Sequence, residues 1–127
     1  MEKDKNCFAI TWRNIVTRTK YSCQGILSAW KGEWAFRKES YCFFIMIPVG
    51  WWIGKTYVEK ALLIGCGLIV LITELLNSAI EAVVDRFGEE HHELAGKAKD
   101  MGSAAVFFSI CLTFLIWALI IYGRLYP

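Results

Sequence analysis

Five polar residues recur at helical spacing along and just after the apolar run 61–84: Glu74, Asn77, Ser78, Glu81 and Asp85. At about 100° per residue they fall within an arc of about 100° on one helix face. A carboxylate at membrane depth costs about 2.5–3.5 kcal/mol even on the mildest scale, so such groups need partners or a chemical role. We call these five residues the polar stripe.

The stripe predicts two different tasks at two depths. Glu81 follows Glu74 by seven residues, which is about 10 Å along a helix axis. If the apolar core covers about 20 residues, Glu81 lies at the water boundary and Glu74 roughly 9 Å inside. Depth favours Glu74 as a base for a lipid hydroxyl, and Glu81 as a ligand for a divalent cation. Simple pairing with cations of neighbouring helices explains the whole stripe less well.

The polar segment 85–100 supplies complementary groups beside the stripe. Carboxylates suit Mg²⁺ and lysines suit phosphate, although charge alone is equally typical of a solvated loop. His91-His92-Glu93 lacks the HxxxH spacing of a zinc site. Neither GxxxxGK[ST] nor GxGxxG occurs in the chain, so a nucleotide site here would be unlike a P-loop or a protein kinase.

The composition predicts a membrane protein that positions these groups on helices. The chain has 127 residues, of which 56% are hydrophobic, too many for so short a soluble domain to bury. We expect an all-α integral membrane domain covering 1–127. Its predicted parts are an amphipathic surface helix at 7–31, transmembrane helices at about 33–54, 60–85 and 100–122, and a cytoplasmic loop at 86–99.

The distribution of basic residues predicts the orientation. Eleven of the 14 Lys and Arg residues lie before Tyr41 or in the loop at 86–99, and three lie in the first loop and C-terminus. The N-terminus and second loop are therefore expected in the cytoplasm and the C-terminus in the periplasm. The five cysteines show no CxxC spacing, and we expect them to act as small hydrophobic residues.

Two sequence runs carry a specific resemblance. TELLNSAIEAVVDRFGEEHHELAGKAKDMGSAAV at 73–106 and SAWKGEWAFRKE at 28–39 closely resemble the prokaryotic diacylglycerol kinase family. The core motif E-x-x-N-[ST]-A-x-E-x-x-x-D, followed by A-x-x-A-K-D, is long and specific. The resemblance implies an inner-membrane homotrimer with composite sites between protomers. It also implies transfer of the γ-phosphate of MgATP to a lipid hydroxyl, with Mg²⁺ as cofactor and no nucleic-acid partner.

The resemblance also implies roles for individual residues. Glu74 is the expected catalytic base, Glu33 and Glu81 the metal ligands, and Asn77 and Asp85 supporting residues. The expected nucleotide-binding positions are Tyr21, Glu33, Glu81, Glu90, His91, His92, Lys99 and Asp100. The expected lipid-binding positions are Arg18, Ala35, Arg37, Glu39, Ser103 and Trp117.

The surface helix departs from the family pattern at several positions. Asn14 stands where many relatives carry Arg, Cys23-Gln24 replaces the more usual Trp-Lys, and Leu27 stands where Arg is familiar. These departures affect the expected headgroup or nucleotide contacts of that helix, and they leave the motif from Glu74 to Glu81 intact.

Three alternatives remain open at this point. Undecaprenol kinase is the closest, and AFRKE and KDMGSAAV favour the diacylglycerol branch over it. A small proton-coupled transporter would use Glu74 but would not need Lys99-Asp100. A non-catalytic membrane subunit would tolerate Glu74→Gln.

Overall fold

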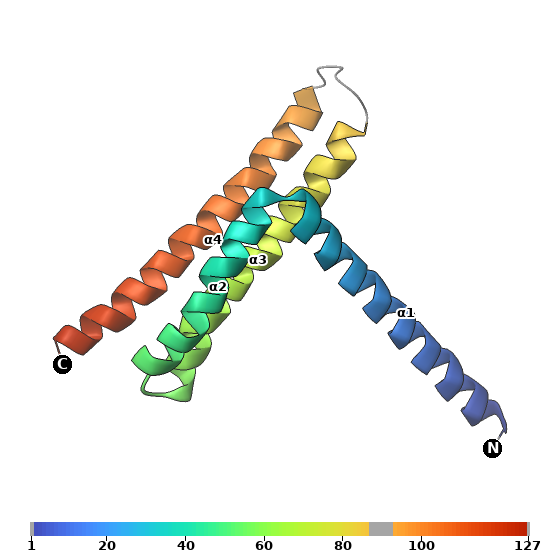
Figure 1. Ribbon diagram of the computed structural model, residues 1–127, viewed down its shortest axis with the longest axis horizontal. Helices are drawn as coiled ribbons and strands as arrows, with labels where there is room; N and C mark the ends of the chain where they lie inside the picture. Colours follow the sequence, from blue (N-terminus) through green and yellow to red (C-terminus); the bar gives the residue numbers. More distant parts are fainter. Residues whose placement is uncertain (1, 87–92, 127) are drawn as a thin grey trace.

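The computed structural model describes the backbone of residues 2–86 and 93–126, and the side chains of 14–86 and 93–126. These residues form four helices and no strand. The helices are α1 (Glu2–Gly32), α2 (Trp34–Ile53), α3 (Tyr57–Asp85) and α4 (Glu93–Leu125). Figure 1 shows α2, α3 and α4 running side by side while α1 leaves them at an angle. The expected all-helical architecture is confirmed.

The middle helix of the bundle is α3, because both α4 and α2 pack along it. Its buried apolar residues are Leu63, Cys66 and Val70. Gly67 lies among them, and a Cβ added there would come within 2.9 Å of Phe43 and 3.0 Å of Met46. The missing side chain therefore lets α2 approach α3 closely, as small residues do at helix contacts in membranes.

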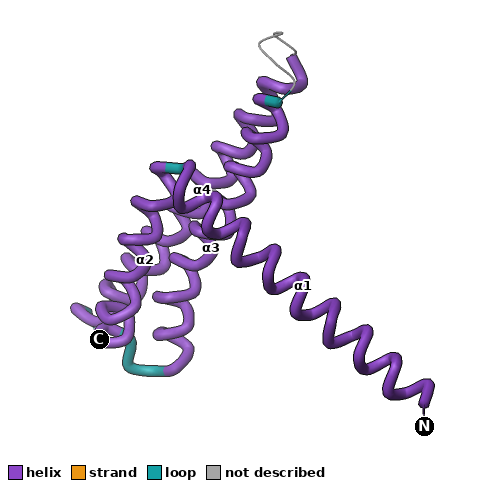
Figure 2. The backbone as a smooth tube through the Cα atoms, turned by 45° about the vertical axis from the view of Figure 1, so that its right-hand side comes forward, coloured by secondary structure: helices purple, strands orange, loops and turns teal. Residues whose placement is uncertain are grey.

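A short turn connects α2 to α3. The amide of Gly54 donates to the carbonyl of Gly50 at 2.9 Å, and Thr56 Oγ1 accepts from the amide of Glu59 at 3.1 Å as the N-cap of α3. At Gly54 a Cβ would lie 2.9 Å from the backbone nitrogen of Lys60, so glycine permits this approach. The turn makes α2 and α3 antiparallel neighbours (Figure 2).

The same end of the bundle is joined to α4 by Arg124. Its guanidinium donates to the carbonyl of Ile53 at the end of α2 and lies 3.2 Å from the Glu59 carboxylate at the start of α3. One side chain therefore contacts the ends of both other helices. The C-terminus accordingly lies next to the α2–α3 turn (Figure 2).

Only the C-terminal part of α1 lies close to the rest of the chain. Every described side chain from Asn14 to Ser28 is exposed, and Ala29 is the first buried one. Arg37 fixes the corner between α1 and α2, because its guanidinium donates to the carbonyls of Trp30 at 2.9 Å and Lys31 at 3.1 Å. Charged donors near a helix C-terminus satisfy carbonyls that lack partners within the helix.

Four helix ends lie at least three residues from their expected positions. Helix α1 begins at Glu2 instead of residue 7, α3 at Tyr57 instead of about 60, and α4 at Glu93 instead of about 100, and α4 ends at Leu125 instead of about 122. The prediction of a loop across 86–99 was therefore wrong for its last seven residues. The error arose because the charges of the run Glu93–Lys99 indicate a loop. The same run is rich in Glu, Leu, Ala and Lys, which favour helix. Lys97 also pairs with Glu93 at 2.7 Å, one helical turn away.

Two of the described helices, α3 and α4, are long and apolar enough to cross a membrane. Most of their apolar surface is exposed in the single chain, as expected for helices that face lipid or further protein. The 20 residues of α2 do not meet the same criterion. Charged residues at its start, Arg37, Lys38 and Glu39, lower its mean hydropathy.

Candidate active site

Glu74 is a buried carboxylate in the middle of the bundle. It lies on α3 with a relative exposure of 6%, although carboxylates are almost never buried without a partner or a role. Three other carboxylates, those of Glu33, Glu39 and Glu81, are close enough to interact with it electrostatically, as is the Lys38 ammonium. Both predicted metal ligands and Glu39 therefore lie within electrostatic range of the predicted base in a single chain.

Asn77 connects the buried part of the stripe to its outer part. Its Nδ2 donates to Glu81 Oε1 at 3.0 Å, so one turn of α3 links the two side chains. Asn77 is buried, whereas Glu81 is only half-buried and reaches the surface of the chain. The Asn77 side chain therefore contacts one of the predicted metal ligands directly.

Glu33 stands at the corner between α1 and α2. It is the N-cap residue of α2 in an extended conformation, with φ −103° and ψ 113°, and its side chain makes no capping hydrogen bond. Beside it a cleft of about 480 Å³ separates α1 from α3. Two of the residues that line this cleft are Glu33, at the corner between the helices, and Ser78, a member of the polar stripe. The carboxylate therefore borders open space on the same side as the stripe.

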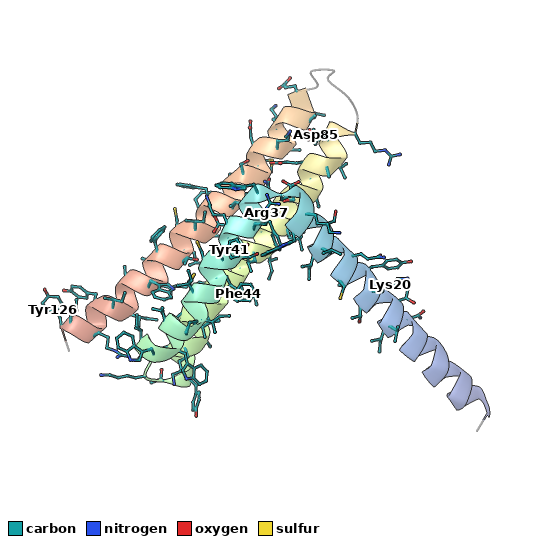
Figure 3. The ribbon with its side chains drawn as sticks, viewed as in Figure 1. Lys20, Arg37, Tyr41, Phe44, Asp85 and Tyr126 are labelled. Atoms are coloured by element: carbon teal, nitrogen blue, oxygen red, sulfur yellow. The ribbon has the colours of Figure 1, made fainter. Side chains whose placement is uncertain are left out.

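The outer end of the polar stripe contacts α4. Lys99 Nζ lies 2.9 Å from Asp85 Oδ1, which connects the start of α4 to the end of α3. Figure 3 shows Asp85 at this end of the helix pair and Tyr126 at the opposite one. Asp100 and Ser103 are exposed on α4 nearby in sequence. Three predicted nucleotide residues, Glu90, His91 and His92, lie outside the described residues.

An apolar groove of about 320 Å³ lies between α2, α3 and α4, and the predicted lipid residues Glu39 and Trp117 line it. The indole nitrogen of Trp117 also donates to the carbonyl of Leu63 at 3.2 Å, so this side chain links α4 to α3. The other lining residues were not predicted: Cys42, Phe43, Met46, Gly67, Val70, Ile110, Thr113 and Phe114. Their three- and four-residue spacing on α2 and α4 was the available signal.

Several predicted ligand-binding residues lie on exposed parts of the chain or make other contacts within it. Arg18 and Tyr21 are exposed on the projecting part of α1, which Figure 3 marks with Lys20. Arg37 uses its guanidinium to bind the end of α1 (Figure 3). Ala35 is half-buried at the start of α2. Arg18 and Tyr21 thus lie on a part of α1 that is exposed in the single chain.

The described carboxylates suit a hard cation that brings other ligands with it. No group of three His, Cys, Asp or Glu side chains that could hold a metal occurs within the described ranges. Mg²⁺ is usually held by one or two carboxylates, together with substrate phosphates and water. Glu33 and Glu81 offer two such oxygen donors near Glu74. The donor set therefore fits Mg²⁺ delivered with a nucleotide better than a metal held by protein alone.

Comparison with known proteins extends over most of the chain. The model of the family "Prokaryotic diacylglycerol kinase" matches residues 20–121. The diacylglycerol kinase of Haemophilus influenzae is 48% identical over 109 residues, which cover 86% of this chain and 92% of that protein. The diacylglycerol kinases of Pseudomonas aeruginosa and Escherichia coli K12 are 45% and 43% identical, each over 87% of this chain and 90% of theirs.

The matched region contains the whole stripe, Glu33, Lys99 and Trp117. It also contains all of α3 and most of α4, as far as Ile121, the two helices that are apolar enough to span a membrane. The chain therefore belongs to the prokaryotic diacylglycerol kinase family.

Proposed function

We propose that the chain is a membrane enzyme that transfers the γ-phosphate of ATP to the hydroxyl of diacylglycerol, forming phosphatidic acid. The observation that carries this proposal is the position of Glu74. Its buried carboxylate lies one turn of α3 from Val70, which lines the apolar groove, and it interacts with Glu33 and Glu81. A lipid in the groove and a nucleotide near these two carboxylates would meet at Glu74.

The chemistry follows from these positions. Glu74 accepts the proton of the lipid hydroxyl while the hydroxyl oxygen attacks the γ-phosphorus. The bond from that phosphorus to the bridging oxygen breaks, and ADP leaves with the electron pair. Glu33 and Glu81 would hold Mg²⁺, which when bound neutralises phosphate charge. Lys99 adds a positive charge on the same side of the bundle.

The membrane arrangement that supports this reaction has three spans. Because α2 packs along α3, a bilayer that α3 crosses also surrounds α2. The exposed face of α2 carries Phe44 and Ile45, which suit contact with lipid. The excess of basic residues before Tyr41 and at 86–99 supports an active site at the cytoplasmic face of the inner membrane, where ATP is available. The C-terminus then lies in the periplasm.

We further propose a homotrimer in which neighbouring protomers complete each site. The support is the exposed part of α1, whose residues Arg18 and Tyr21 lie apart from Glu74 of their own chain. A neighbouring protomer gives that helix a surface to cover. Mixed trimers of Tyr21→Ala and Glu74→Gln chains test this sharing. Activity above that of either variant alone supports it, and activity no higher than either variant contradicts it.

The direct test of the proposed reaction uses ATP labelled in its γ-phosphate. The purified full-length chain in lipid bicelles receives diacylglycerol, undecaprenol or neither, and extracted lipids are counted. We expect label in phosphatidic acid when diacylglycerol is present. Label in undecaprenyl phosphate instead would assign the chain to the other lipid, and absence of label in any lipid would favour a transporter or a non-catalytic subunit.

A further inference from the structure

Gly102 of α4 is buried directly against Asn77 of α3. A Cβ added at Gly102 would collide with Asn77 Oδ1, and it would lie 3.3 Å from Asn77 Cγ and 3.6 Å from Ile80 Cδ1. The three residues after it, Ser103, Ala104 and Ala105, are exposed. Among these four small residues, position 102 is therefore the one at which packing requires glycine, and the side chain that it faces is Asn77.

The hydrogen bond between Asn77 and Glu81 determines the orientation of the Asn77 amide. Its Nδ2 donates to Glu81 Oε1, and a reversed amide would place an oxygen against that carboxylate. The amide oxygen must consequently face Gly102. There it is buried and has no hydrogen-bond partner among the described atoms. Such an oxygen is tolerated where the neighbouring residue leaves room for it, and a methyl group at position 102 would remove that room.

We propose that Gly102 is a positioning residue for Glu81 and acts through Asn77. The absent side chain at position 102 keeps the Asn77 amide in the orientation that holds the Glu81 carboxylate. The inference rests on the proposed function, because it gives Glu81 the task of binding the divalent cation. Groups that hydrogen bond to metal ligands orient them, and their loss commonly weakens metal binding by about 10- to 100-fold.

The test measures binding of the Mn²⁺ complex of a non-hydrolysable ATP analogue to the full-length chain in bicelles, without turnover, from the electron paramagnetic resonance spectrum of Mn²⁺. The variants are Gly102→Ala, Asn77→Ala and the double variant. Gly123→Ala is the matched control, since it lies on the same helix and its added Cβ has nothing within 4 Å. Glu81→Gln tests the proposed ligand itself. Far-UV circular dichroism and thermal unfolding report on folding.

We expect Gly102→Ala and Asn77→Ala each to weaken binding of the Mn²⁺ complex roughly tenfold. The double variant should bind no more weakly than Asn77→Ala, because both changes remove the same contact. Gly123→Ala should bind like the wild type. Asn77→Ala adds no volume, so it keeps the test decisive if Gly102→Ala does not fold.

Two results would overturn the inference while leaving the kinase proposal intact. One is unchanged affinity for the Mn²⁺ complex in folded Gly102→Ala or in Asn77→Ala, and the other is losses that multiply in the double variant. A different result, wild-type affinity in Glu81→Gln, would remove Glu81 as a ligand. It would overturn the metal part of the proposed function together with the inference.

Discussion

Lys99 of α4 and Asp85 of α3 form an ion pair, with 2.9 Å between Nζ and Oδ1. The pair occupies the end of the bundle that holds the outer part of the polar stripe (Figure 3). The family resemblance implies that Lys99 binds the nucleotide and that Asp85 has a supporting role. Both tasks are compatible if the pair holds Lys99 near the site until a phosphate competes for it.

Replacing Lys99 and replacing Asp85 should have unequal effects on kcat/KM for ATP. We expect Lys99→Met to lower kcat/KM for ATP by roughly 10²-fold, because a cation that stabilises phosphate charge is lost. Asp85→Asn should have a much smaller effect, since Lys99 remains. Both side chains are well exposed, so neither change should alter thermal stability greatly. Steady-state kinetics with varied ATP measure the difference.

Lys97→Met is the control for that comparison, because Lys97 pairs with Glu93 on the surface of the same helix. Equal losses in Lys99→Met and Asp85→Asn would mean that the ion pair itself matters and would argue against a phosphate contact of Lys99.

Two substitutions of Trp117 should distinguish its part in lipid binding from its part in helix packing. Trp117→Phe keeps a ring in the groove but loses the hydrogen bond to the Leu63 carbonyl. We expect it to lower the free energy of unfolding by about 0.5–1.5 kcal/mol and to leave KM for diacylglycerol unchanged. Trp117→Ala empties that part of the groove and should raise KM for diacylglycerol roughly tenfold, without changing KM for ATP.

Surface-dilution kinetics with both substrates check these values, and Trp52→Ala serves as the control because Trp52 is 84% exposed. A rise in KM for diacylglycerol with Trp117→Phe as large as with Trp117→Ala would show that the groove does not receive the lipid.

Arg124 should matter for stability and not for catalysis. Arg124→Ala removes the hydrogen bond to the Ile53 carbonyl and the contact with Glu59. A charged donor to a carbonyl contributes about 1.5–3 kcal/mol, so the free energy of unfolding should fall by about that amount. Turnover per folded molecule should stay at the wild-type level, since the contact lies at the opposite end from Asp85.

Unfolding in sodium dodecyl sulfate, followed by circular dichroism, measures the loss for Arg124→Ala. Lys55→Ala is the matched control, because it removes an exposed cation from the same turn. Reduced turnover in folded Arg124→Ala would contradict the separation of the two ends.

Much of this arrangement could be predicted from the sequence. The helix expected at about 33–54 is observed at 34–53, because the apolar run that begins at Tyr41 is too short to cross a bilayer alone and the helix must start before it. The contact between Asn77 and Glu81 follows from four-residue spacing on one face. Lys99 and Asp85 are separated by 14 residues, and their pairing depends on how α3 and α4 align.

Other features depend on contacts between helices, which sequence spacing does not specify. Small residues occupy 102–105, and such runs favour close packing of membrane helices, yet only Gly102 is buried, since the rotation of α4 decides which residue faces α3. The corner role of Arg37 was missed for a similar reason. Its side chain lies near the end of α1 only because the chain bends between Gly32 and Trp34.

The most direct test of the account is phosphoryl transfer by Glu74→Gln. Labelled γ-phosphate of ATP is followed into diacylglycerol for the wild type, for Glu74→Gln, and for Glu59→Gln as a carboxylate at the other end of α3. We expect Glu74→Gln to fold normally and to lose turnover by roughly 10²- to 10⁴-fold, while Glu59→Gln retains it. Turnover of folded Glu74→Gln close to the wild-type value would contradict the assignment of Glu74 as the base.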